Sequence, residues 1–145
     1  MIVYPNTDYD SWISEDLADV YFETRLNADT WFAAANKEAA LMTAFRSLAE
    51  LNLNLTLDDD GIMSSDVYTD IEAETILAAL KQAQCEQALH ELIHDLDNPN
   101  IAGLSLGGLI SVKLPVNQTP PLRYSERALL ILRPYIVAQT VTRTR

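Results

Sequence analysis

Hydrophobic residues recur at helical spacing through much of the chain, and the longest such stretch runs from Asp70 to Leu96. It holds no glycine or proline, so it predicts one helix of roughly 40 Å, capped by Asp70 or Thr69 and ended by Pro99. Its hydrophobic stripe changes side part-way, by about a third of a turn. The two stripes are Ala73, Ile76, Leu77, Leu80 and Ala83, then Leu89, Leu92, Ile93 and Leu96. We therefore expect a central helix whose halves pack on different neighbours, within the chain or in a second copy.

Three shorter stretches also have helical spacing, and each follows a residue that is favourable as an N-cap. The expected helices run from Ser14 to about Leu26, from Asn36 to about Glu50, and onward from Ser125 until Pro134 ends or kinks the last one. Leu17, Val20 and Tyr21 mark the apolar side of the first helix. The pattern predicts a mainly α fold, a small helical bundle around one long central helix.

The spacing changes to every second residue at Leu51, Leu53, Leu55 and Leu57, which alternate with asparagine and threonine. This period is typical of a half-buried strand or an extended arm, and an acidic turn at 58–61 closes it. We call residues 51–69 the arm. Because it is too apolar to stand in water, we expect it to lie on the body or on a neighbouring subunit.

A second non-helical stretch, residues 101–116, predicts a small β element. It is either one bent strand or a hairpin that turns at Gly107 and Gly108, and the hairpin is favoured with its register open. Residues 138–145 read as an extended C-terminal tail. We therefore expect one domain, with a body of residues 1–137 followed by this tail.

The chain is acidic, and its charge is unevenly distributed. The net charge is −11, but residues 1–100 carry −16 and residues 101–145 carry +5. The acidic part repels nucleic-acid phosphates. No secretory signal and no membrane span are expected from the sequence, and the single cysteine, Cys85, excludes a disulfide framework and favours a reduced compartment.

One short motif has the form of a zinc-hydrolase signature, His90-Glu91-Leu92-Ile93-His94. In H-E-x-x-H, two imidazoles one helical turn apart bind zinc, and the glutamate acts as general base. These are the only histidines of the chain, and the longer signature fails because Asp97 and Asn100 stand where glycine and histidine are needed. A zinc hydrolase is therefore the lesser alternative, and we assign no catalytic, cofactor or metal residue.

Two further patterns fail as binding motifs. If Gly61 is the sixth residue of a calcium loop, Thr56 and Val67 occupy the positions that require Asp and Glu. The glycines at 103–108 have no following Lys-Ser/Thr and open no helix, so they form no phosphate loop. The acidic turn and the β element are the better interpretations.

The chain as a whole resembles a known family. The residues that carry the likeness are Tyr9, Ala18-Asp19-x-Tyr21-Phe22-x-x-Arg25-Leu26, Trp31, Lys37-Glu38-Ala39-Ala40-Leu41-x-x-Ala44, the long Ala-rich helix and Arg133-Pro134-Tyr135. With them the chain is similar to the head–tail connector (adaptor, head completion) proteins of tailed bacteriophages, a group often labelled DnaT-like putative single-stranded DNA-binding proteins. It departs from them at 51–69, where many relatives carry a Trp-Gly and a Trp-Pro-Arg element.

The resemblance implies a structural virion protein rather than an enzyme. Such adaptors form a ring, typically of twelve copies, that joins the portal to the next neck or tail-completion protein and lets double-stranded DNA pass through its bore. It implies a location in the virion neck, after assembly in the host cytoplasm, and a C-terminal segment that reaches the portal. The alternative function, suggested by the label that members of this family often carry, is a single-stranded DNA-binding module. The expected portal contacts are Val137, Gln139, Val141, Arg143 and Arg145, and the expected subunit or tail contacts are Leu53, Leu55 and Leu57.

Overall fold

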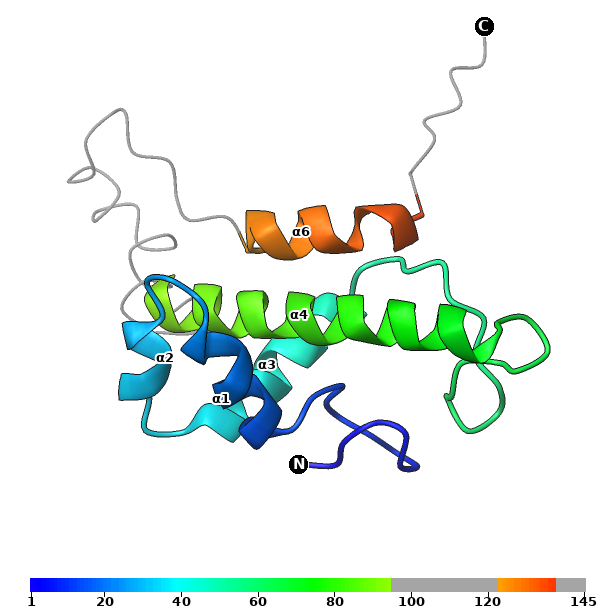
Figure 1. The fold of residues 1–145 in the computed structure, drawn as a ribbon, viewed down its shortest axis with the longest axis horizontal. Helices are drawn as coiled ribbons and strands as arrows, with labels where there is room; N and C mark the ends of the chain where they lie inside the picture. Colours follow the sequence, from blue (N-terminus) through cyan, green and yellow to red (C-terminus); the bar gives the residue numbers. More distant parts are fainter. Residues whose placement is uncertain (95–122, 138–145) are drawn as a thin grey trace, which may run out of the picture.

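A computed structural model describes residues 1–94 and 123–137. This part of the chain is mainly helical, as predicted. The β element predicted at 101–116 and the tail predicted at 138–145 lie outside the described residues. The elements are α1 (Glu15–Glu23), α2 (Asp29–Ala33), α3 (Lys37–Ala49), α4 (Asp70–His94), α6 (Glu126–Leu132) and the 3-10 turn η2 (Arg133–Tyr135) (Figure 1).

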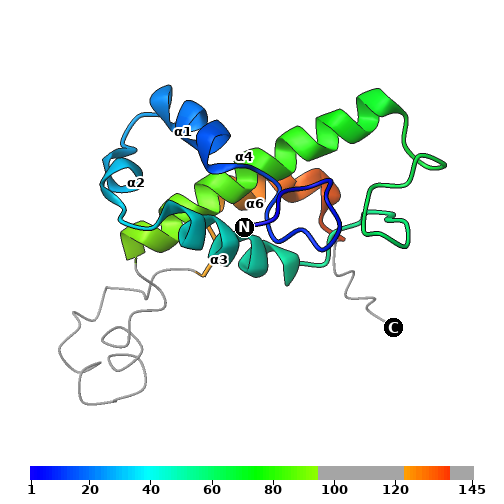
Figure 2. The same ribbon diagram turned by 90° about the horizontal axis from the view of Figure 1, so that it is seen from below.

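The long helix α4 is the centre of the arrangement. In Figure 1, α1, α2 and α3 lie on one side of α4 and α6 lies on the opposite side. Seen from below, α4 passes between α1 and α3, with α6 behind it (Figure 2). The arm loops out beyond the N-terminal end of α4 in both views. None of the helices in the described ranges combines the length and apolar character that crossing a membrane requires.

The predicted N-caps are confirmed by their hydrogen bonds. Side-chain oxygens of Ser14, Asn36 and Ser125 accept from the backbone N–H three residues later, at 3.3, 3.0 and 3.3 Å. At the start of α4 the cap is Thr69, whose Oγ1 accepts from the Glu72 N–H. Helix α1 ends at Glu23 rather than near Leu26: Thr24 leaves helical backbone angles, with φ of −102° and ψ of 5°, and the Arg25 N–H donates to the carbonyl oxygen of Phe22, three residues back, at 3.2 Å.

The two stripes of α4 pack on two different clusters, as predicted, and both clusters belong to this chain. The second half joins α1, α2 and the start of α3, around Trp31 and Leu41. The first half joins the end of α3, α6 and the arm, around Leu48 and Leu132. Ile93 is a correction: the helical wheel puts it in the second stripe, but its side chain is 52% exposed. Within the described residues, both clusters are thus built from side chains of one copy.

The arm is an extended segment rather than a strand of a sheet. Within the described residues it makes isolated bridges only, Leu53 with Ile136 and Leu57 with Met63. The alternation is confirmed for Leu51, Leu53 and Leu55, which are half-buried against the α3–α4–α6 cluster. The predicted turn is present as well: Asp58 Oδ1 accepts from the N–H groups of Asp60 and Ile62.

Candidate functional site

The middle of α4 is surrounded on every side. All residues from Ala83 to Leu89 are buried, which is nearly two turns of helix without an exposed face. Three of them are polar: Gln84, Glu86 and Gln87, which we call the clip residues. Each one holds a different segment of the chain to α4, so together they fix where the outer surfaces of the protein lie.

Gln84 holds the N-terminal segment. Its Oε1 accepts from the backbone N–H of Trp12 at 2.9 Å, and its Nε2 donates to Ser11 Oγ and to the carbonyl oxygen of Leu41, both at 2.8 Å. Buried backbone groups need such partners because water cannot reach them. One amide therefore joins residues 11–12, α3 and α4.

Glu86 holds α1. Its carboxylate accepts from Arg25 Nε at 2.7 Å and Nη2 at 2.9 Å, and from the Tyr21 hydroxyl at 2.5 Å. Burial alone would raise the pKa of Glu86, but the hydrogen bonds from Arg25 and Tyr21 and the charge of Arg25 outweigh it, so this pKa lies below its ordinary value. Burial and the same carboxylate raise the pKa of Tyr21. The ion pair of Arg25 and Glu86 is therefore charged on both sides at neutral pH.

Gln87 holds α6. Its Nε2 donates to the carbonyl oxygen of Arg123 at 2.9 Å, and its Oε1 accepts from the N–H of Ser125 at 2.8 Å. The sequence pattern alone does not distinguish the clip residues from other polar residues of the helix. The sequence did hold a clue to them. The hydrophobic stripe of the helix changes side in this region, so a polar residue there is expected to face another segment of the chain.

The H-E-x-x-H residues do not converge on one point. The rings of His90 and His94 lie 4.5 Å apart, centroid to centroid, but Glu91 Oε1 accepts from Ser47 Oγ on α3 at 2.6 Å. Burial and the neighbouring His90 lower the pKa of His94. Across residues 1–94 and 123–137, no three His, Cys, Asp or Glu side chains are grouped so that they would hold a metal ion.

Three large aromatic side chains that could stack on bases are buried in the core. Trp12, Phe22 and Trp31 are at most 5% exposed. Phe22 stacks on Trp31 with centroids 4.6 Å apart, and Phe45 packs against Trp12 at 4.5 Å. These rings build the core.

Of the expected portal contacts, Val137 alone lies in the described part of the chain. Its side chain is 39% exposed, and its N–H donates to the carbonyl oxygen of Asn52 at 2.8 Å. The Asn54 N–H in turn donates to the carbonyl oxygen of Tyr135 at 2.6 Å. Residues 135–137 are thus paired with the arm and belong to the body. Gln139, Val141, Arg143 and Arg145 lie outside the described residues.

The three arm leucines line the same hollow but differ in exposure. Leu53, Leu55 and Leu57 all line a hollow of about 270 Å³, together with Tyr9 and Trp12. Leu53 and Leu55 are half-buried, whereas Leu57 is 44% exposed. Leu57 is therefore the most exposed of the three.

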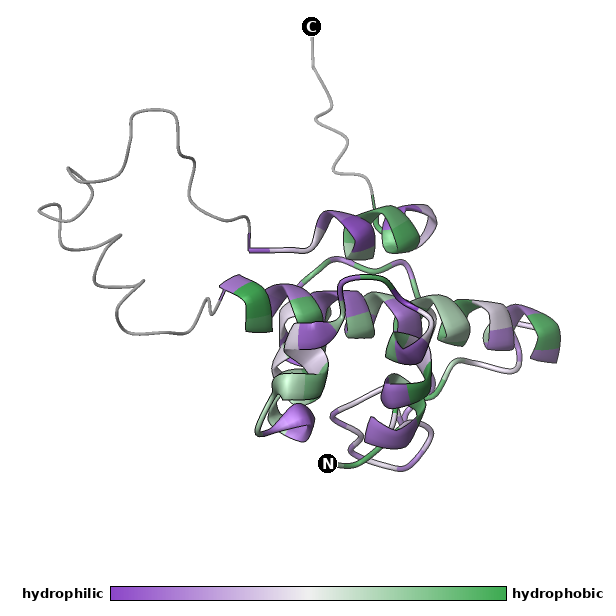
Figure 3. Ribbon diagram, turned by 60° about the vertical axis from the view of Figure 1, so that its left-hand side comes forward, coloured by the Kyte–Doolittle hydropathy of each residue, from purple (hydrophilic) through white to green (hydrophobic). Residues whose placement is uncertain are grey.

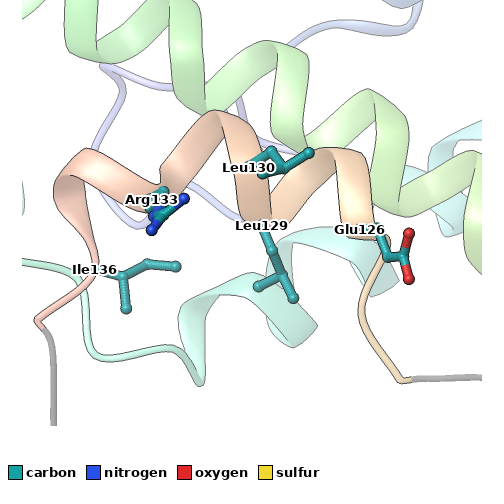
Figure 4. A pocket seen from close by; sticks show the side chains of 5 residues that line it. All are labelled: Glu126, Leu129, Leu130, Arg133 and Ile136. Atoms are coloured by element: carbon teal, nitrogen blue, oxygen red, sulfur yellow. The ribbon is translucent and has the colours of Figure 1, made fainter.

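Helix α6 has an apolar outer face. Leu130 is 65% exposed and lies beside a hollow of about 550 Å³, whose lining is shown in Figure 4: Glu126, Leu129, Leu130, Arg133 and Ile136. A second hollow of about 280 Å³ begins on the other side of Leu130, towards Tyr21 and Glu86. Figure 3 shows hydrophobic residues along α6. We call this surface, residues 123–137, the α6 face.

Two other groups of exposed apolar residues lie near opposite ends of the long axis (Figures 1 and 2). The arm end, residues 57–74, exposes Leu57, Val67 and Ile71. The α1–α2 end exposes Leu17, Val20, Leu26 and Phe32. Leu17 and Val20 were expected on the inner side of α1, but Ala18 and Phe22 are buried instead, because Phe22 stacks on Trp31.

Comparison of the chain with models of protein families, with curated proteins and with solved structures gives no match.

Proposed function

We propose that this chain is a structural adaptor, whose copies assemble into a ring that joins a phage portal to the tail. One observation carries the proposal. Within the described residues two core clusters form inside one copy, yet three separate surfaces still expose large apolar residues, on the α6 face, at the arm end and at the α1–α2 end. Single exposed apolar residues are ordinary, but more than one on each of three surfaces would suit a subunit with several neighbours.

The separation of these surfaces favours a ring over a two-fold dimer. A two-fold dimer uses one surface twice, whereas a contact between two unlike surfaces repeats around a circle. The surfaces here lie on different elements and near different ends of α4. The resemblance to connector proteins supports the same architecture, with about a dozen copies.

The charge of the chain suits a conduit for DNA. The net charge is −11, and a negative wall repels phosphates, so DNA would pass without sticking. The C-terminal tail, with Arg143 and Arg145, is proposed to contact the portal. It continues directly from Val137, at the end of the α6 face.

A truncation tests the portal contact. The chain is cut after Val137, because residues 135–137 are paired with the arm and should stay in the truncated protein. We expect the truncated chain to keep its circular-dichroism spectrum and melting temperature but to stop co-purifying with the portal protein encoded in the same genome. Undiminished co-purification would contradict the assignment of the tail.

The two alternatives have direct tests as well. A salt-dependent gel shift of single-stranded DNA at micromolar protein would support the DNA-binding module. Stoichiometric zinc in elemental analysis, lost in a His90→Ala variant, would support the hydrolase. Our proposal expects neither result.

A further inference from the structure

We propose that the α6 face of one copy binds the arm end of a second copy. This inference rests on the proposed ring and names the two surfaces that meet in it. Its basis is that the two surfaces carry similar apolar residues but opposite charge.

The α6 face is basic as well as apolar. Residues 123–137 contain three arginines and one glutamate. Arg123 is paired with Glu50 at 3.1 Å, and Arg127 lines the smaller hollow beside Glu86. Arg133 lines the larger hollow beside Leu130, where Glu126 is the other charged residue of the lining. An apolar partner with acidic neighbours would fill the larger hollow and meet Arg133.

The arm end has the complementary character. Residues 57–74 contain seven aspartates and glutamates and neither lysine nor arginine. Between these acids Val67 is 54% exposed and Ile71 is 77% exposed. Ile71 lies on the first turn of α4, which is a rigid position for a side chain that enters a hollow.

The remaining apolar end is a poorer partner for a basic surface. At the α1–α2 end, residues 15–33 contain five aspartates and glutamates and one arginine, and Asp19 is paired with Lys37 at 3.0 Å. This end is therefore less acidic than the arm end, which has seven acids and no lysine or arginine. This end serves as the control surface below.

The two surfaces meet between copies. α6 lies along one side of α4 and the arm end lies beyond the N-terminus of α4, so the two surfaces are on different parts of one copy (Figures 1 and 2). Among the described residues, no ion pair joins 57–74 to 123–137. Contact between unlike surfaces leaves one of each free at the ends of a row, which is the condition for closing a ring.

Disulfide trapping between copies tests the contact. In a Cys85→Ala background, a pool of Leu130→Cys chains is mixed with a pool of Ile71→Cys chains and oxidised. We expect a crosslinked dimer to form about tenfold faster than in a control mixture of Leu130→Cys with Leu26→Cys, since docking raises the effective concentration of one pair only. Equal rates in the two mixtures would overturn the proposal.

Exchanging the charges of Arg133 and Asp66 distinguishes crosslinking of docked copies from crosslinking by random collision. Arg133→Glu in the first pool should slow trapping about tenfold, because like charges then oppose each other across the contact. Asp66→Lys in the second pool should restore the rate when it is combined with Arg133→Glu. Loss without restoration would show that Arg133 does not face the arm end, and would overturn the proposal.

The outcomes also separate this inference from the ring itself. If the chain assembles on the portal while the Leu130 and Ile71 pools trap no faster than the control, the ring stands and this contact is wrong. If disulfide trapping between copies proceeds as expected and no portal complex forms, the contact between copies stands and the adaptor function is wrong.

Discussion

The guanidinium of Arg25 and the carboxylate of Glu86 form a bidentate ion pair across 61 positions of sequence, at 2.7 and 2.9 Å. The carboxylate side chain is 2% exposed and the guanidinium side chain 17%. This pair joins the segment that follows α1 to the middle of α4. Together with Gln84 and Gln87, it holds the N-terminal segment, α3 and α6 in place around α4.

Removing Arg25 should destabilise the fold strongly. In Arg25→Met, the Glu86 carboxylate stays buried without its counter-charge, and we expect a loss of about 3 kcal/mol in the free energy of unfolding. Arg123→Met is the matched control, because its pair with Glu50 is exposed and should cost less than about 0.5 kcal/mol. Urea denaturation measures both, and equal losses would contradict the assigned role.

The same pair predicts a pH dependence. Because the pKa of Glu86 is lowered in the folded state, its stabilising contribution is present above the ordinary value of 4.5 and is lost as pH falls through the folded-state pKa. The stability difference between the wild type and Glu86→Gln should therefore shrink below about pH 4.5. A difference that stays constant from neutral to acid pH would show that the carboxylate is not held as described.

Replacing Gln84 should lower the free energy of unfolding far more than replacing Gln82, two residues away on the same helix. Gln84→Leu leaves the Trp12 N–H and the Leu41 carbonyl oxygen without their partner, which we expect to cost about 2 kcal/mol. Gln82→Leu changes an exposed side chain on the same helix and should be nearly neutral. Thermal melting of the two variants checks this, and a neutral Gln84→Leu would refute the clip.

Cys85 should be inert in the folded protein. Its side chain is fully buried, and burial, with the nearby Glu86, raises its pKa to about 12. A thiol reagent at neutral pH should label the chain in denaturant but not in native buffer. Rapid native labelling would mean that the middle of α4 opens readily.

The sequence was most informative where structure depends on neighbouring residues. The N-caps at Ser14, Asn36 and Ser125 follow from local hydrogen bonding, and the alternating leucines of the arm follow from spacing. The change of stripe on α4 also predicted two packing partners. It did not say that both lie within the same chain, because periodicity records which side of a helix is buried and not what covers it.

The side chains that hold the helices together were harder to find. Glu86 resembles any acidic residue of an exposed helix until the fold brings Arg25 to it. Leu17 and Val20 match an inner face by spacing, yet stacking of Phe22 on Trp31 turns the helix so that they are exposed. The H-E-x-x-H pattern is the converse case: the spacing matches a zinc signature, and in the fold Glu91 accepts a hydrogen bond from Ser47 on α3.

The most direct test of the adaptor account is mass photometry of the portal protein encoded in the same genome, with and without this chain. We expect the portal particle to gain about a dozen copies, each of 16.2 kDa, and negative-stain images to show an added ring at one end. A portal particle whose mass is unchanged at micromolar concentrations of the chain would contradict the account.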